Sequence, residues 1–109
     1  MKRFVQLASI GLCLGFGLPA IANDGASLYM TKGCIGCHGA EGIAPVAPTY
    51  PKIGMQNKEY TINQLKDFKS SARNNGMAAL MLGMVAGLTD DDIEKIADYL
   101  ANVKAGDKK

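Results

Sequence analysis

The sequence predicts an all-α domain of about four helices. Apolar residues recur at helical spacing towards the C-terminus, residues that favour helix N-termini precede three segments, and no segment alternates apolar and polar residues as a half-buried strand does. No repeat is evident in the chain. These observations favour one small helical unit and argue against a sheet.

Residues 1–22 have the pattern of a secretory signal peptide. Lys2 and Arg3 form a short basic region, a mostly apolar stretch follows, and Ala20-Ile21-Ala22 fits a cleavage site. The apolar stretch is short for a membrane span, which needs about 20 residues. We therefore expect residues 23–109 to be the mature domain, exported to the periplasm and without stable membrane insertion.

Charge also limits the partners of this domain. Lys2 and Arg3 account for the formal net charge of +2, so residues 23–109 are close to neutral. Because no basic stripe is present, we expect no nucleic-acid partner.

Two helices are predicted in the first two thirds of the domain. Asp24 is placed to cap a helix over about residues 25–32, which Gly33 would end. Asn57 is placed to cap a second helix over about residues 58–70, with Tyr60, Leu65 and Phe68 near one face.

The last helix has the strongest signals. Thr89 and Asp92 have the spacing of a capping box, and three successive aspartates would interact favourably with the positive end of the helix dipole. Its apolar stripe consists of Ile93, Ile96, Ala97, Leu100 and Val103, and Gly106 ends the pattern.

Other segments are predicted to be irregular or remain undecided. Prolines 45, 48 and 51 exclude a helix over residues 43–54, and residues 73–76 have the composition of a turn. The methionine-rich stretch 77–85 fits either a helix or a loop.

The run Cys34-Ile35-Gly36-Cys37-His38 matches the Cys-x-x-Cys-His pattern of c-type haem attachment. Two thiols at this spacing can each add to one vinyl group of a porphyrin. The histidine that follows can then act as the proximal iron ligand. We therefore predict one covalently bound haem c, attached through Cys34 and Cys37 and ligated by His38.

Competing interpretations of this run find little support. A zinc site needs four ligands, whereas the chain has one histidine and only Cys13 as a further cysteine. A thioredoxin-like redox pair would lie in a βαβ context, and a disulfide between Cys34 and Cys37 would close a short, strained loop.

The second axial ligand of the iron cannot be another histidine, because His38 is the only one in the chain. Met77, Met81 and Met84 lie far enough along the sequence to reach the opposite face of the porphyrin. A methionine ligand would raise the reduction potential. Methionine also fills gaps in apolar cores, so spacing by itself does not choose among the three.

Taken together, the attachment run, the proline-bearing loop, the methionine segment and the stretch Leu88 to Tyr99 resemble class I c-type cytochromes. The resemblance covers almost all of residues 23–109 and is strongest to small single-haem bacterial members related to the halves of periplasmic dihaem cytochromes. It implies the cytochrome c fold, in which helices and loops wrap around one covalently attached haem.

The resemblance also implies roles for particular residues. Met81 is the first methionine of the family's Met-x-Gly-Met pattern and is therefore the expected iron ligand, with Met84 second and Met77 third. Gln56, Tyr60 and Gln64 match the segment beside the haem propionates. Pro45 matches the loop residue whose carbonyl accepts the Nδ1 proton of the proximal histidine. Tyr29 and Tyr99 match positions where the first and last helices cross.

The function implied is one-electron transfer, by a monomeric carrier that is not an enzyme and that meets redox partners transiently at an exposed haem edge. The apolar residues Ile35, Ile43, Ala44 and Val46 would line that edge or belong to the core. Two alternatives remain: the haem subunit of a larger dehydrogenase or oxidase complex, and a gas-binding or peroxidatic domain with a displaceable sixth ligand.

Overall fold

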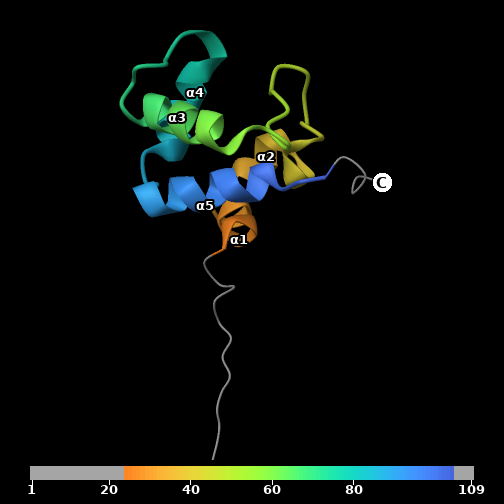
Figure 1. The fold of residues 1–109 in the computed structure, drawn as a ribbon. Coiled ribbons are helices and arrows are strands. Elements are labelled where there is room, and N and C mark those ends of the chain that lie inside the picture. The colour runs from red at the N-terminus through yellow and green to blue at the C-terminus, as the bar shows by residue number, and fades with distance from the viewer. Residues whose placement is uncertain (1–23, 105–109) are drawn as a thin grey trace, which may run out of the picture.

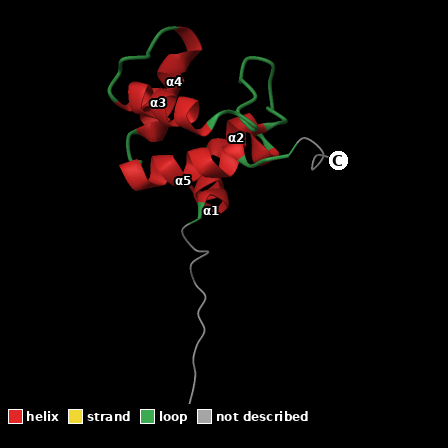
Figure 2. Cartoon of the chain, in the orientation of Figure 1, coloured by secondary structure: helices red, strands yellow, loops and turns green. Residues whose placement is uncertain are grey.

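The computed structural model describes residues 24–104, and the proposed signal peptide therefore lies outside the described residues. Within this range the chain consists of helices and loops without a strand, which confirms the predicted all-α class (Figures 1 and 2). The α-helices are α1 (Gly25–Thr31), α2 (Cys34–His38), α3 (Lys58–Lys69), α4 (Ala79–Val85) and α5 (Asp90–Ala101), with short 3-10 helices η3 (Ala40–Gly42) and η4 (Gly76–Ala78).

The described segment has one more α-helix than the sequence suggested. The difference is the short helix α2, which is the attachment run itself. The undecided methionine-rich stretch is helical, as η4 followed by α4. Helix α5 ends at Ala101, earlier than the pattern suggested, and Val103 is half-buried beyond it.

All three predicted N-caps are present. The side chain of Asp24 accepts from the backbone N–H of Ser27 at 2.9 Å, and that of Asn57 accepts from Tyr60 at 2.9 Å. Thr89 and Asp92 form both hydrogen bonds of a capping box, each 3.0 Å long. These caps satisfy N–H groups that have no partner within their own helices.

Helices α1 and α5 cross in close contact (Figure 1). Gly25 makes this approach possible, because a Cβ at that position would lie only 2.1 Å from the carbonyl oxygen of Lys95. At the crossing the rings of Tyr29 and Tyr99 have centroids 5.5 Å apart and planes inclined by 46°. The expectation that these two tyrosines mark the helix crossing is therefore confirmed.

The core lies on the inner face of α5. The predicted stripe is buried as expected, with Ile93, Ile96, Ala97 and Leu100 all at or below 2% exposure. Tyr29, Phe68, Val85 and Leu88 complete the buried set. On α3 the buried residues are Thr61 and Phe68, whereas Tyr60 is 50% exposed, so the predicted apolar face of α3 is turned slightly from the observed one.

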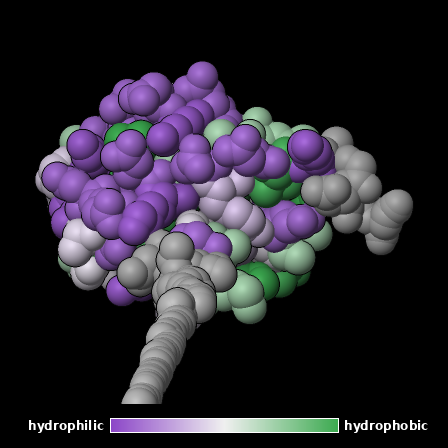
Figure 3. All heavy atoms as spheres, turned by 60° about the horizontal axis from the view of Figure 1, so that its bottom comes forward, coloured by the Kyte–Doolittle hydropathy of each residue, from purple (hydrophilic) through white to green (hydrophobic). Residues whose placement is uncertain are grey.

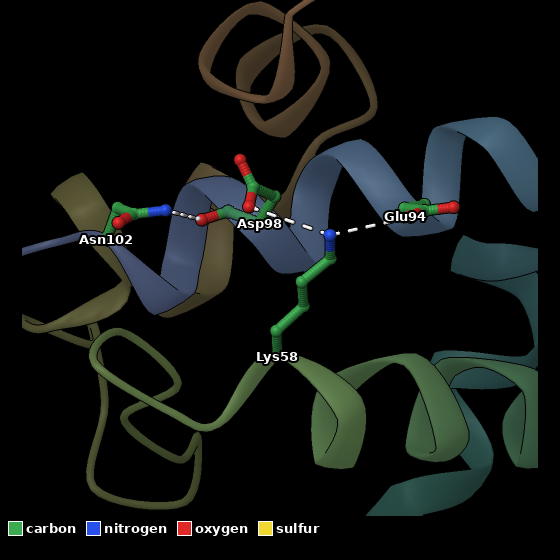
Figure 4. Close-up of polar contacts among 4 residues, drawn as sticks. All are labelled: Lys58, Glu94, Asp98 and Asn102. Carbon is green, nitrogen blue, oxygen red and sulfur yellow. Dashed lines mark hydrogen bonds and ion pairs between the residues drawn. The ribbon is translucent and has the colours of Figure 1, made fainter.

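The first residue of α3 is held beside α5 by a pair of surface ion pairs (Figure 4). The Nζ atom of Lys58 lies 3.4 Å from a carboxylate oxygen of Glu94 and 3.7 Å from one of Asp98. Since both carboxylates are exposed and Lys58 is only half-buried, each pair contributes at most about 1 kcal/mol. Packing of apolar side chains, rather than these charges, holds α3 in place.

The outer surface near α1 and α5 is mainly hydrophilic, with hydrophobic side chains gathered towards the side where α2 and the following loop lie (Figure 3). In that loop Val46 is 64% exposed and Ala44 is also exposed, whereas Ile35 packs against the core. None of the helices described is long and apolar enough to cross a membrane.

Candidate functional site

Helix α2 presents the two cysteines of the attachment run side by side. Gly33, with φ of +86°, makes the sharp change of direction between α1 and α2. Because residues three apart lie on one face of a helix, Cys34 and Cys37 point to the same side, and both line a large cavity. They are not joined in a disulfide.

The histidine that ends α2 is buried and oriented. His38 is 6% exposed, and its Nδ1 lies 2.8 Å from the carbonyl oxygen of Pro51. A carbonyl can only accept, so Nδ1 carries the proton and Nε2 keeps the lone pair needed to bind a metal. The ring of Tyr50 lies nearby, with its centroid 6.4 Å from that of His38.

The prediction that Pro45 supplies this carbonyl is wrong, because the structure gives the role to Pro51. The loop leaves α2 and turns back. Val46 is tied to the carbonyl of Cys37 at 3.0 Å, and Ile53 and Gly54 both bond to the carbonyl of Gly42, at 2.8 and 2.9 Å. These bonds bring the returning half of the loop, rather than its first proline, over the imidazole.

The cavity has a volume of about 660 Å³, a size typical of sites that enclose a small organic ligand or cofactor. Its apolar wall comes from the loop, α3, α4 and α5 and includes Ile53, Leu65, Phe68, Leu80, Val85, Leu88, Ile96 and Leu100. Cys34, Cys37 and His38 line it as well. A wide apolar space that contains two thiols and an imidazole fits a covalently attached haem.

All three candidate methionines line this cavity. They differ in exposure: Met77 is 52% exposed and Met84 44%, whereas Met81 is half-buried and packs against the hydrophobic core. The methyl group of Met84 lies close to Gly33, since a Cβ at that glycine would be 3.1 Å from Met84 Cε. Met84 is therefore at the edge of the cavity beside the attachment run.

The structure also brings Gln56, Tyr60 and Gln64 to the cavity, as the sequence led us to expect for residues near the propionates. Two further residues at the cavity are not indicated by the sequence. The sequence does not distinguish Pro51 from the other loop prolines, and it predicts Arg73, which also lines the cavity, only as part of a turn. No local signal distinguishes either residue, because both reach the site through the return of the chain.

Burial raises the pKa of the Cys34 thiol above its ordinary value. The environment therefore favours an uncharged sulfur at this position, and a thioether is such a sulfur. A second hollow of about 710 Å³ lies between α1 and α5 on the outer surface, but its lining is mostly charged and contains none of the predicted haem contacts.

Comparison with known proteins identifies the class. The chain belongs to the cytochrome c family, since the family described as Cytochrome c matches residues 22–104. This confirms the resemblance to class I c-type cytochromes and means that the chain carries covalent haem c, which Cys34, Cys37 and His38 would hold.

Among individual relatives, cytochrome c4 of Stutzerimonas stutzeri is 35% identical over an alignment of 95 residues that covers 80% of this chain and 45% of that protein. Cytochrome c-553 of Nitratidesulfovibrio vulgaris is 32% identical over an alignment of 104 residues that covers 94% of this chain and the whole of that protein. The crystal structure of reduced recombinant cytochrome c4 from Pseudomonas stutzeri superposes with a TM-score of 0.65 at 32% identity, covering 89% of this chain and 53% of that one. The chain thus spans about half the length of its cytochrome c4 relatives.

Proposed function

We propose that this chain is a one-electron carrier in which a single haem c is held between His38 and Met81. When bound, the haem supplies an iron that alternates between the ferrous and ferric states. The observation that carries the proposal is one cavity lined by both cysteines, an oriented histidine and a half-buried methionine. The membership of this chain in the cytochrome c family supports the role of an electron carrier rather than that of an enzyme.

The surrounding residues suit this role. The hydrogen bond from His38 to the carbonyl of Pro51 fixes the orientation of the imidazole. It also makes Nε2 a stronger electron-pair donor to a metal, as outer-shell partners do for metal-bound histidines. The apolar wall would keep water away from a bound haem, which would limit solvent rearrangement when the charge of the iron changes. Met81 is preferred over Met77 and Met84 because its side chain is the least exposed of the three and is fixed by packing.

The proposal includes export. The basic and apolar pattern of residues 1–22 supports a cleaved signal peptide and a periplasmic location, where redox partners would dock briefly at the haem edge through a small interface.

The experiment is a spectroscopic redox titration of the protein purified from a host that attaches haem c. We expect a covalent haem, low-spin spectra in both states and the weak far-red ferric band of methionine-ligated iron. Met81→Ala should abolish that band and lower the midpoint potential, whereas Met84→Ala, the matched control, should leave both largely intact. The opposite pattern would assign the ligand to Met84.

Two outcomes would favour the alternative functions. High-spin spectra of the unaltered protein would favour a domain with a displaceable sixth ligand, and co-purification with a dehydrogenase or oxidase would favour a subunit of a larger complex.

A further inference from the structure

Helix α4, which carries Met81, has little stability of its own. It has only seven residues, and isolated helices shorter than about 12 residues are marginal in water. Its N-cap residue, Ala78, has no side chain that could accept a hydrogen bond. Gly83 lies in its interior on the exposed side, and a Cβ there would meet no atom within 4 Å, so packing does not require a glycine. Helix α4 therefore depends on contacts with its neighbours to keep Met81 in position.

The C-terminal end of α4 is held by a small set of contacts. The side chains of Val85 and Leu88 are buried in the hydrophobic core. The backbone N–H of Leu88 donates to the carbonyl of Val85 at 3.0 Å. The carbonyl of Leu88 in turn accepts a hydrogen bond from the ammonium group of Lys69, the last residue of α3. Residues 19 apart in the sequence are thus joined, and the connection from α4 to α5 is tied to α3.

This contact has no substitute in the described part of the chain. Helices α3 and α4 lie against each other (Figure 1). Among the hydrogen bonds and ion pairs of residues 24–104, the bond from Lys69 is the only one that links α3 to residues 86–89. The Lys69 ammonium also makes no ion pair within that range. Without Lys69 the carbonyl of Leu88 would lose its protein partner, which is unfavourable as long as the segment stays packed.

We propose that Lys69 is a positioning residue that keeps α4 closed over the cavity and thereby holds Met81 on the iron. In the closed state the Leu88 carbonyl is paired with Lys69. In an open state, α4 moves away by local unfolding and this carbonyl meets water. Losing the bond therefore destabilises the closed state relative to the open one. This inference rests on the proposed function, and it applies equally if Met84 is the ligand, because Met84 also belongs to α4.

Two substitutions should shift this equilibrium in opposite directions. Lys69→Met keeps the length of the side chain but removes the charged donor, and it should raise the open fraction about fivefold. Gly83→Ala should lower the open fraction about fourfold, because alanine is the better helix former and the site has room for a methyl group. Neither Lys69 nor Gly83 lines the cavity, so both changes act through α4 rather than through contact with the haem.

The test uses ferric holoprotein and titrates it with imidazole, which displaces a methionine ligand and removes the far-red band. Since imidazole reaches the iron only in the open state, its apparent affinity is proportional to the open fraction. Hydrogen–deuterium exchange of the amides in residues 79–88 measures the same opening without any reaction at the iron. The amides of α1 and α5 report on unfolding of the rest of the molecule.

The variants are Lys69→Met, Lys69→Arg, Gly83→Ala and, as a matched control, Lys66→Met. Lys66 is another exposed cation in the last turn of α3, and it does not line the cavity. Lys69→Met should bind imidazole more tightly and exchange faster in residues 79–88, with α1 and α5 unchanged. Lys69→Arg should restore most of the closed state, because arginine keeps a charged donor. Gly83→Ala should bind imidazole more weakly, and Lys66→Met should behave as the unaltered protein.

The outcomes separate this inference from the proposed function. If the unaltered protein lacks the far-red band, the proposed methionine ligation fails. If the band is present but Lys69→Met resembles Lys66→Met in both measurements, the role of Lys69 is refuted and the electron carrier stands. Faster exchange to the same extent in α1, α4 and α5 would also refute it, since Lys69 would then act on overall stability. If Lys69→Met does not accumulate as holoprotein, Lys69→Gln is compared with Lys66→Gln, and equal imidazole affinities would overturn the proposal.

Discussion

The hydroxyl of Tyr29 donates to the carbonyl oxygen of Gly39 at 2.6 Å, in the buried interior of the molecule. This bond links α1 to the residue directly after His38. Gly39 has a φ of +81°, and a Cβ there would lie 1.9 Å from the carbonyl oxygen of Ala44. The peptide next to the proximal histidine is therefore fixed both by a tyrosine from another helix and by the close return of its own loop.

This bond predicts a pH dependence of stability. Burial is the main cause that raises the pKa of the Tyr29 phenol above its ordinary value of about 10. Below that ordinary value Tyr29 is protonated in both the folded and the unfolded chain. As the pH rises above about 10, the unfolded chain loses this proton while the folded chain keeps it, and stability falls by up to about 1.4 kcal/mol per pH unit.

Urea denaturation of the unaltered protein and of Tyr29→Phe, at pH 9 and at pH 11, measures this effect. The variant should lose about 1 kcal/mol at pH 9, where the hydrogen bond is removed, and should show a weaker decline between the two pH values. Equal declines in the two proteins would contradict the assignment to Tyr29.

The close crossing of α1 and α5 predicts that Gly25→Ala is destabilising. Its new methyl group would meet backbone atoms of Lys95, which cannot move aside as a flexible side chain can. We expect a loss of about 1–3 kcal/mol in the free energy of unfolding. Gly87→Ala is the matched control, because a Cβ there has no neighbour within 4 Å and should change stability little. If Gly25→Ala had the same free energy of unfolding as the unaltered protein, α1 and α5 would be able to move apart without loss of stability.

The capping box at α5 predicts a smaller effect. Thr89→Ala removes the hydroxyl that accepts the N–H of Asp92 and should cost about 1 kcal/mol, measured by thermal or urea denaturation. Thr31→Ala, at the exposed last residue of α1, lacks this role and serves as the control. If the two variants lose the same amount, the box contributes nothing beyond the general effect of losing a threonine.

The size of the cavity predicts dependence of folding on the haem. Replacing both Cys34 and Cys37 by alanine removes the covalent attachment of the haem. The wide apolar cavity should then lack the group that would fill it, so most of the folded protein should be lost. Far-ultraviolet circular dichroism and a thermal melt of the double variant test this. A well-folded, cooperatively melting, haem-free product would show that the remaining core is sufficient without the macrocycle.

The sequence by itself determined the helical class, the positions of three capped helices and the residues that attach the haem. These features are local: an N-cap is a contact between residues two or three apart, a helical stripe repeats within a few residues, and the attachment run is five residues long. Short-range patterns of this kind are sufficient to predict the helix caps at Asp24, Asn57 and Thr89, and the structure contains all three.

Only the tertiary structure decided which distant groups meet at the site. It placed the carbonyl of Pro51, rather than that of Pro45, against His38, and it brought Arg73 to the cavity beside Gln64. It also distinguished the half-buried Met81 from its more exposed neighbours. The physical reason is that each of these relationships depends on how a loop returns over a helix. That path is set by long-range packing and backbone hydrogen bonds, which short-range sequence patterns do not encode.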